Sequence, residues 1–235
     1  MQVTLAYQES SLSRATTFMF TAFFDLDGTL VDSKEGITRC LQTTLNELGA
    51  EVPSAEELEW CIGPSLFQSF TILLGEGADI EGAVELYREH YANGGIYEAD
   101  IYDGLGDMFE VLQSIGARMY IATSKLEISG KEVAEHFGLT HYIDRVFGSE
   151  PDGTREDKTE LLAFTFSETE TDPAKAVMIG DRRFDIFGAK NNNVANIGVL
   201  WGFGGADELR EAEADMLAGH PEELPEIIGD LLGIN

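Results

Sequence analysis

The chain has little positive charge and no long apolar run. Its 235 residues carry 15 lysine and arginine side chains against 43 aspartates and glutamates, which gives a formal net charge of −28. Proteins that bind nucleic acid polymers do so through basic surfaces, so we expect no such partner. The apolar segment 18–24 is broken by Thr21 and is far shorter than the roughly 18 residues that a membrane-spanning helix needs. We therefore expect no membrane partner.

Cysteine is scarce as well. Cys40 and Cys61 are the two cysteines of the chain, too few for disulfides to hold together a fold of this size. The first 17 residues also lack the apolar stretch of a secretory signal. Both observations predict a cytoplasmic protein. The strong acidity has two open explanations, which are adaptation to high salt and a merely acidic surface.

From residue 18 onward, short apolar segments alternate with segments of helical period. The short segments are residues 18–24, 117–123, 143–148, 176–180 and 195–201. Apolar residues occupy both faces of each, as in parallel strands that are covered by helices on both sides. The alternation predicts an α/β fold with a Rossmann-like parallel sheet core and helices on both faces.

One interval lacks predicted strands. Ile37, Leu41 and Leu45 form an apolar stripe that ends at Gly49, and Ser54 with Glu57 has the pattern of a capping box. A helical block directly after the first strand of a sheet predicts a small all-α cap domain above the carboxyl ends of the strands. The predicted parts are an N-terminal extension of residues 1–17, a core of residues 18–33 and 104–235, and a helical cap of residues 34–103.

Two carboxylates two residues apart, Asp25 and Asp27, follow the first predicted strand and precede Gly28. Like charges this close repel each other unless a cation lies between them or one of them holds a proton. The simpler interpretation is a solvated Asp-Gly turn. An EF-hand calcium loop is excluded because glycine is the fourth residue of this motif and not the sixth.

A second acidic pair, Asp181 and Asp185, follows the predicted strand 176–180. Two exposed acids that lie four residues apart destabilise a helix by roughly 0.2–0.5 kcal/mol. The positive end of the helix dipole offsets part of this repulsion, so two acids in the first turn of a helix are a simple alternative to a site. A bound divalent cation would remove the conflict.

Two further groups follow predicted strands. The predicted strand 117–123 ends with Thr123 and is followed by Ser124 and Lys125. The predicted strand 143–148 is followed by Lys158, one of six lysines in the chain. Each is a weak signal alone, because hydroxyls are common at strand ends and an exposed lysine pairs with neighbouring acids. Parallel strands bring their carboxyl ends to one edge of the sheet, so we expect all four groups to meet there.

In this order the motifs resemble those of the haloacid dehalogenase superfamily, which read Asp-x-Asp-x-Thr, Ser/Thr, Lys and Gly-Asp-x-x-x-Asp. The resemblance extends from about Met19 to the C-terminus. It implies a phosphoric monoester hydrolase in which Asp25 is the nucleophile and becomes an aspartyl-phosphate. Asp27 would protonate the leaving group and later activate water.

The resemblance also implies a phosphate site and a metal site. Thr123, or Ser124 in the alternative register, would donate to the phosphoryl oxygens, and Lys158 would balance their charge. Mg²⁺ is the implied cofactor, because the ligands are hard oxygens and the substrate brings a phosphate. The implied metal ligands are Asp25, Asp181, Asp185 and the backbone carbonyl of Asp27. The implied phosphate-binding residues are Gly28, Thr123, Ser124 and Lys158.

An acid at Asp27 separates phosphatases from dehalogenases and phosphonate-cleaving members, which usually lack it. A cap favours small soluble phosphomonoesters as substrates, and residues 61–65 resemble the loop of the cap that faces the site. The chain is most similar to the phosphoglycolate phosphatase branch, with 5′-nucleotidase as the alternative and a phosphosugar mutase as a weaker one. The stretches that carry this similarity are residues 148–155, where Pro151 departs from the pattern, 180–183 and 199–204. We expect a monomer or a homodimer.

Overall fold

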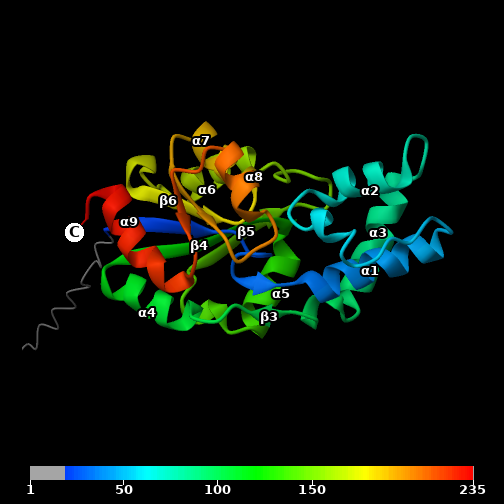
Figure 1. Ribbon diagram of the computed structural model, residues 1–235, viewed down its shortest axis with the longest axis horizontal. Coiled ribbons are helices and arrows are strands. Elements are labelled where there is room, and N and C mark those ends of the chain that lie inside the picture. Colours follow the sequence, from blue (N-terminus) through cyan, green and yellow to red (C-terminus); the bar gives the residue numbers. More distant parts are fainter. Residues whose placement is uncertain (1–18, 235) are drawn as a thin grey trace, which may run out of the picture.

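The computed structural model describes residues 19–234, so the predicted N-terminal extension lies outside the described residues. At its centre is a parallel sheet of six strands in the order β5-β4-β1-β6-β7-β8 (Figure 1). The strands are β1 (Phe20–Phe24), β4 (Ala117–Leu126), β5 (Arg145–Ser149), β6 (Ala176–Gly180), β7 (Ala195–Val199) and β8 (Met216–Ala218). The predicted α/β fold is confirmed.

Helices cover both faces of the sheet, as Figure 1 shows. Phe24 of β1 packs on Phe109 of one layer, with ring centroids 5.6 Å apart, and Phe23 packs on Phe166 of the other at 5.1 Å. Every residue of β1 is buried, which explains its uninterrupted apolar sequence. The first layer contains α4 (Leu105–Ser114), α5 (Glu127–His136) and α9 (Leu224–Leu232); the second contains α6 (Lys158–Thr169), α7 (Arg183–Asn191) and α8 (Gly205–Glu211).

The strands differ from the prediction at several places; β7, for example, ends at Val199 and not at residue 201. β5 begins at Arg145 and not at residue 143, because the Ile143 amide donates to the Leu139 carbonyl in the preceding turn. β4 continues past Thr123 to Leu126. The edge strand β8 was not predicted, since it has three residues and the side chain of Ala218 alone is buried.

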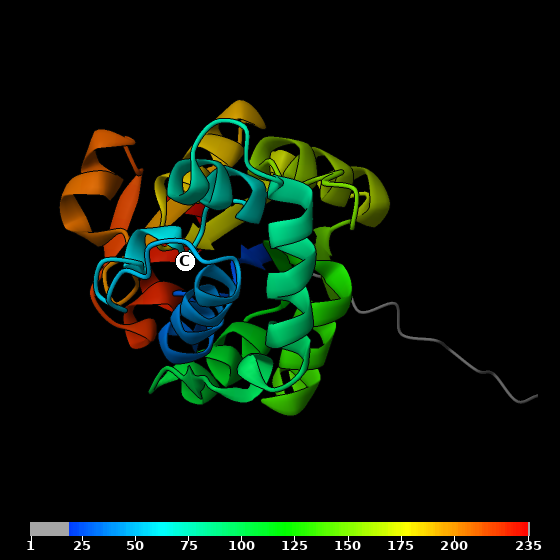
Figure 2. The same ribbon diagram turned by 90° about the vertical axis from the view of Figure 1, so that its right-hand side faces the viewer.

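Helices α1 (Lys34–Glu47), α2 (Leu66–Leu74) and α3 (Ile80–Ala92) form what we call the helical lobe, residues 34–97. Both α1 and α2 pack on α3. The lobe lies beyond the carboxyl ends of the strands (Figures 1 and 2). Among its buried side chains are Leu41, Leu45, Phe70, Val84 and Tyr87, whereas Leu48 is exposed.

The prediction that residues 34–103 contain no strand was wrong at one end. β2 (Val31–Asp32) pairs antiparallel with β3 (Asp100–Ile101), so the chain enters and leaves the lobe through one two-stranded ribbon. Both capping-box hydrogen bonds between Ser54 and Glu57 form, yet only a turn and the 3₁₀ helix Glu59–Cys61 follow. Pro64 lacks an amide hydrogen and disfavours helix in the residue before it, so no helix continues past residue 62.

Among residues 19–234, no helix has both the length and the apolar character required to cross a membrane.

Candidate active site

Asp25 directly follows β1 and is held by the neighbouring strand. Its amide donates to the carbonyl of Ile179 on β6 at 2.9 Å, and its side chain is buried. The chain then turns back at Gly28, which has a φ of +82°. The Gly28 amide, which we expected to donate to phosphate, donates to the Val31 carbonyl at 2.8 Å. Gly28 therefore serves the turn, and its N–H is not directed at a ligand.

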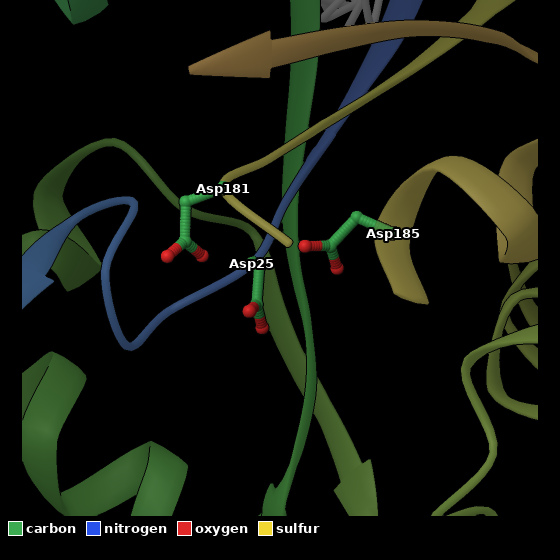
Figure 3. Close-up of side chains that lie close together, drawn as sticks. All are labelled: Asp25, Asp181 and Asp185. Carbon is green, nitrogen blue, oxygen red and sulfur yellow. The ribbon is translucent and has the colours of Figure 1, made fainter. Parts of the chain in front are cut away.

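Three carboxylates from two strand ends meet beside this turn. Asp25, Asp181 and Asp185 each place one oxygen within 4.8 Å of the others, and all three side chains are buried (Figure 3). Asp181 follows β6, and Asp185 lies in the first turn of α7. The structure thus brings together the acids that the sequence placed at the ends of separate strands.

Lys158 is the cation that contacts this cluster. Its Nζ lies 2.9 Å from Asp25 Oδ1 and 2.8 Å from Asp185 Oδ1, and it donates to the Ala122 carbonyl at 2.8 Å. Burial alone would lower the pKa of the Lys158 ammonium, but the carboxylates of Asp185 and Asp25 outweigh burial and raise it. Lys158 therefore stays charged at neutral pH.

The negative charge of the cluster exceeds what Lys158 can balance. Burial, with the neighbouring Asp185 carboxylate, raises the pKa of Asp25 to about 6 despite the opposing effect of Lys158. Burial, Asp185 and Asp25 raise the pKa of Asp181 well above its ordinary value. A divalent cation fits between these carboxylates. Their oxygens are hard donors, and the carboxylates repel one another when all three are ionised unless further positive charge is present.

The three acids are not equivalent as ligands. Asp185 Oδ2 accepts from the Arg182 amide at 3.1 Å, whereas its buried Oδ1, which lies 2.8 Å from Lys158 Nζ, has no hydrogen-bond partner among the described residues. Asp181 Oδ2 accepts from the Phe203 amide at 2.7 Å, and its Oδ1 accepts from the Thr29 hydroxyl at 3.4 Å. Asp25 Oδ2 has no hydrogen-bond donor within the described part of the chain. Asp25 Oδ2 and Asp185 Oδ1 are therefore the oxygens most available to a cation, and hydrogen bonds hold Asp181 in place beside them.

Glycines behind Asp181 form a part of the site that sequence reasoning missed. A Cβ atom on Gly28, Gly202 or Gly204 would overlap atoms of Asp181. The loop after β7 can approach the Asp181 carboxylate only because these positions have no side chain. The sequence signal was present, since residues 199–204 contain both glycines, but nothing local shows what they approach.

A cavity of about 250 Å³ lies between the sheet edge and the helical lobe, beside Asp25 and Asp27. Thr123 and Ser124 both line it, so both residues that we predicted for phosphate binding lie at the site. The lobe side is mainly apolar, with Arg88 as its charged residue; its larger apolar and aromatic residues are Ile37, Ile62, Leu66, Tyr87 and Tyr91. The loop of residues 61–65 also lines the cavity, which matches its predicted position facing the site.

Basic residues connect the core to the lobe. One is Arg88 of α3, which donates to the Pro151 carbonyl at 2.9 Å, and Lys125 and Arg182 are two more. The Lys125 ammonium lies 2.8 Å from Asp27 Oδ1 and 2.6 Å from the Tyr91 hydroxyl. Arg182 donates to Glu208 Oε1 at 2.9 Å and to the Ile62 carbonyl in the lobe loop. Sequence reasoning gave none of these residues a role, although Lys125 adjoins a predicted hydroxyl pair and Arg182 adjoins Asp181.

Comparison with known proteins identifies the family. Residues 22–199 match the family described as haloacid dehalogenase-like hydrolase. The chain belongs to this family. The prediction of a haloacid dehalogenase-like phosphatase is confirmed at that level, because relatives at high coverage carry phosphatase and 5′-nucleotidase names.

The chain is 43% identical to a 5′-nucleotidase from Pseudomonas aeruginosa, over 80% of this chain and 85% of that protein. It is 33% identical to the tyrosine-protein kinase PtkA of Mycobacterium tuberculosis, over 88% and 71%. Identity to a phosphoglycolate phosphatase from Aquifex aeolicus is 27%, over 89% and 97%. A crystal structure of a predicted phosphatase from Clostridium acetobutylicum superposes with a TM-score of 0.84 at 32% identity, over 93% of this chain and all of that one.

Proposed function

We propose that the protein is a Mg²⁺-dependent phosphatase that hydrolyses small phosphomonoesters through an aspartyl-phosphate on Asp25. The observation that carries the proposal is the position of Asp25. Asp25 belongs to a buried cluster of acids that is suited to a divalent cation. It also lines a substrate-sized cavity, together with Asp27. A nucleophile, an acid and a cation site at one cavity are what phosphoryl transfer needs.

Asp25, Asp181, Asp185 and the backbone carbonyl of Asp27 would hold Mg²⁺. The ion supplies positive charge that lets a phosphate dianion approach a carboxylate. Local positive charge is essential here, because a chain with a net charge of −28 repels an anionic substrate as a whole.

In the first step, an Asp25 oxygen attacks phosphorus and the bond from phosphorus to the ester oxygen breaks. Asp27 transfers its proton to the departing alkoxide. Lys158 balances charge on Asp25, and the hydroxyls of Thr123 and Ser124 donate to phosphoryl oxygens. In the second step, Asp27 takes a proton from water, the water oxygen attacks phosphorus, and Asp25 leaves as a carboxylate with release of inorganic phosphate.

The helical lobe would act as a cap, with the cap domain extending over residues 34–103. It contributes the outer wall of the cavity, and its loop contacts the sheet through the Ile62 carbonyl and Arg182. A cap that lies over the site keeps bulk water from the phosphorylated Asp25 and limits substrates to small soluble esters.

For the substrate we favour nucleoside 5′-monophosphates over 2-phosphoglycolate, which the sequence motifs ranked first. The lobe side of the cavity is apolar and contains two stacked tyrosines, Tyr87 and Tyr91, whose ring centroids are 5.8 Å apart. A nucleoside offers apolar and aromatic surface to such a wall, whereas glycolate offers a carboxylate. The higher identity to the 5′-nucleotidase supports the same order.

2-Phosphoglycolate remains the second candidate on one observation. Arg88 and Lys125 line the same cavity, and either cation could pair with a carboxylate.

We also infer that the protein works in the cytoplasm, because Cys40 and Cys61 are buried free thiols, as expected in a reducing compartment.

The test measures phosphate release from a nucleoside 5′-monophosphate, 2-phosphoglycolate, p-nitrophenyl phosphate and glucose 1-phosphate, with MgCl₂ or with chelator. We expect Mg²⁺-dependent release, and a kcat/KM at least about tenfold higher for the nucleotide than for 2-phosphoglycolate. Asp25→Asn should remove the activity, whereas Asp107→Asn, at an exposed aspartate of α4, should leave it unchanged. Equal rates for wild type and Asp25→Asn would overturn the proposal.

A further inference from the structure

Lys125 joins the two walls of the cavity. It stands near the end of β4, and its side chain is 12% exposed. On the sheet side its Nζ lies 2.8 Å from Asp27 Oδ1. On the lobe side it lies 2.6 Å from the hydroxyl of Tyr91 on α3 and 4.6 Å from the centre of the Tyr91 ring. One ammonium therefore fixes a carboxylate of the core and a hydroxyl of the lobe together.

The direction of these hydrogen bonds follows from the chemistry of lysine. An ammonium has three donors and no acceptor, so Asp27 Oδ1 and the Tyr91 oxygen must both accept. A carboxyl oxygen that accepts from an ammonium is not the oxygen that carries a proton. Oδ1 of Asp27 is therefore occupied by Lys125, and Oδ2 is the oxygen left to exchange a proton with the leaving group.

The same argument fixes the role of the Tyr91 hydroxyl. Its oxygen accepts from Lys125, so its own hydrogen remains to be donated, and residues 19–234 provide no acceptor for it among their hydrogen bonds. Tyr91 lines the cavity, and burial followed by the nearby Asp27 charge raises its pKa well above the ordinary value. The hydroxyl thus keeps its hydrogen and can donate to an atom in the cavity.

We propose that Lys125 is a positioning residue that holds the Asp27 carboxyl group through Oδ1, so that Oδ2 is the oxygen left to face the leaving group, and that presents the Tyr91 hydroxyl to the same place. The inference rests on the proposed phosphatase function. The proton moves from Asp27 Oδ2 to the ester oxygen as its bond to phosphorus breaks, and Tyr91 donates a hydrogen bond without losing its proton. Because Tyr91 belongs to α3, the arrangement is complete only when the lobe covers the site.

A positioning role for Lys125 can be told from a purely structural role by comparing substrates whose leaving groups differ in their need for a proton. p-Nitrophenolate departs without a proton, whereas the 5′-alkoxide of a nucleoside needs one. The ratio kcat/KM covers the steps up to phosphorylation of Asp25, so it reports proton donation to the leaving group separately from hydrolysis of the intermediate. A positioning defect lowers this ratio for the nucleotide alone, and a folding defect lowers it for both esters.

The experiment compares Lys125→Met, Lys125→Arg and Tyr91→Phe with wild type on a nucleoside 5′-monophosphate and on p-nitrophenyl phosphate. We expect Lys125→Met to lower kcat/KM about 100-fold for the nucleotide, at the low end of what a positioned acid contributes. For p-nitrophenyl phosphate we expect less than about a fivefold loss. Tyr91→Phe should cost the nucleotide about tenfold, and Lys125→Arg should restore most of the rate. Equal losses on both esters would overturn the proposal.

Two controls separate this proposal from the phosphatase proposal. Lys131→Met removes a lysine that is 55% exposed and pairs with Glu127 on α5, and it should change neither ester. Crystal structures of wild type and Lys125→Met give a readout that needs no turnover. We expect the Asp27 carboxyl group to rotate in the variant. An unmoved Asp27 would overturn the positioning role, whereas a wild type that hydrolyses no phosphomonoester would overturn only the phosphatase assignment.

Discussion

The two walls of the cavity differ in chemistry. On the sheet side, Asp25, Asp181 and Asp185 form a buried acidic cluster around Lys158. On the lobe side, the wall is mainly apolar and includes the start of α2 and the tyrosines of α3. Charge is therefore concentrated where the phosphoryl group would react, and apolar surface lies where the rest of the substrate would bind. Substitutions on the two sides should change different kinetic constants.

The largest effect should come from Lys158→Met. Removing one partner of a buried ion pair leaves uncompensated charge, so the free energy of unfolding should fall by about 3–5 kcal/mol. The kcat for the nucleotide should fall by at least about 10²-fold, because a charge at the reacting group is lost. Urea denaturation in the presence of chelator measures the first change, and phosphate release in the presence of MgCl₂ measures the second.

Lys175→Met is the matched control, because Lys175 is exposed and does not line the cavity. It should change the free energy of unfolding by no more than about 0.5 kcal/mol. If the Lys158→Met protein were as stable as this control, Lys158 would not balance the charge of the buried acids on the sheet side.

An intermediate effect is expected on the lobe side from Leu66→Ala. Loss of apolar contact with the substrate should raise KM for the nucleotide about tenfold and leave kcat within about twofold, since this binding is the same in the ground state and the transition state. Ile72→Ala on the same helix is the control, because Ile72 is 60% exposed and does not line the cavity. A fall in kcat with no change in KM would show that the lobe takes part in the chemistry.

The smallest effect is a pH dependence that belongs to the sheet side. In metal-free protein, the native state holds a proton on Asp25 up to a pKa of about 6, whereas the unfolded chain loses it near the ordinary value for aspartate. The native state thus binds more protons in between, and the free energy of unfolding should fall by about 1 kcal/mol between pH 5 and pH 7. Burial of Asp181 acts in the same direction.

This dependence can be measured by urea denaturation at pH 5, 6 and 7 with chelator present. The general repulsion among surface acids contributes to the slope in every variant, so the difference between wild type and Asp25→Asn is the relevant quantity. The variant should show the shallower slope. Identical slopes would mean that Asp25 ionises in the native protein as easily as in the unfolded chain.

The sequence predicted those site residues whose place in the fold follows from their position just after a strand. The apolar segments predicted the central strands, and the acids just beyond them, Asp25 and Asp181, meet because parallel strands end at one edge. The ribbon of β2 and β3 was missed because each strand has two residues and its partner lies nearly 70 positions away, which leaves no local pattern.

The missed parts of the site have the same cause. Gly202 and Gly204 matter because of their approach to Asp181, which the fold alone creates. Lys125 acquires a role through Tyr91, a residue of a different part of the fold. The Ser54 capping box was a genuine local signal, and its hydrogen bonds form, but only a turn and a 3₁₀ helix follow it before the chain reaches Pro64.

The ribbon of β2 and β3 has a consequence for how such enzymes diversify. Its strands are paired, so the chain leaves the sheet and returns to it at points only about 5 Å apart. Whatever is spliced between these points leaves the spacing of Asp25 and Thr123 untouched. A foreign lobe grafted at this junction would therefore bring a new substrate preference to an unaltered reaction centre, which makes the junction a natural place to recombine relatives.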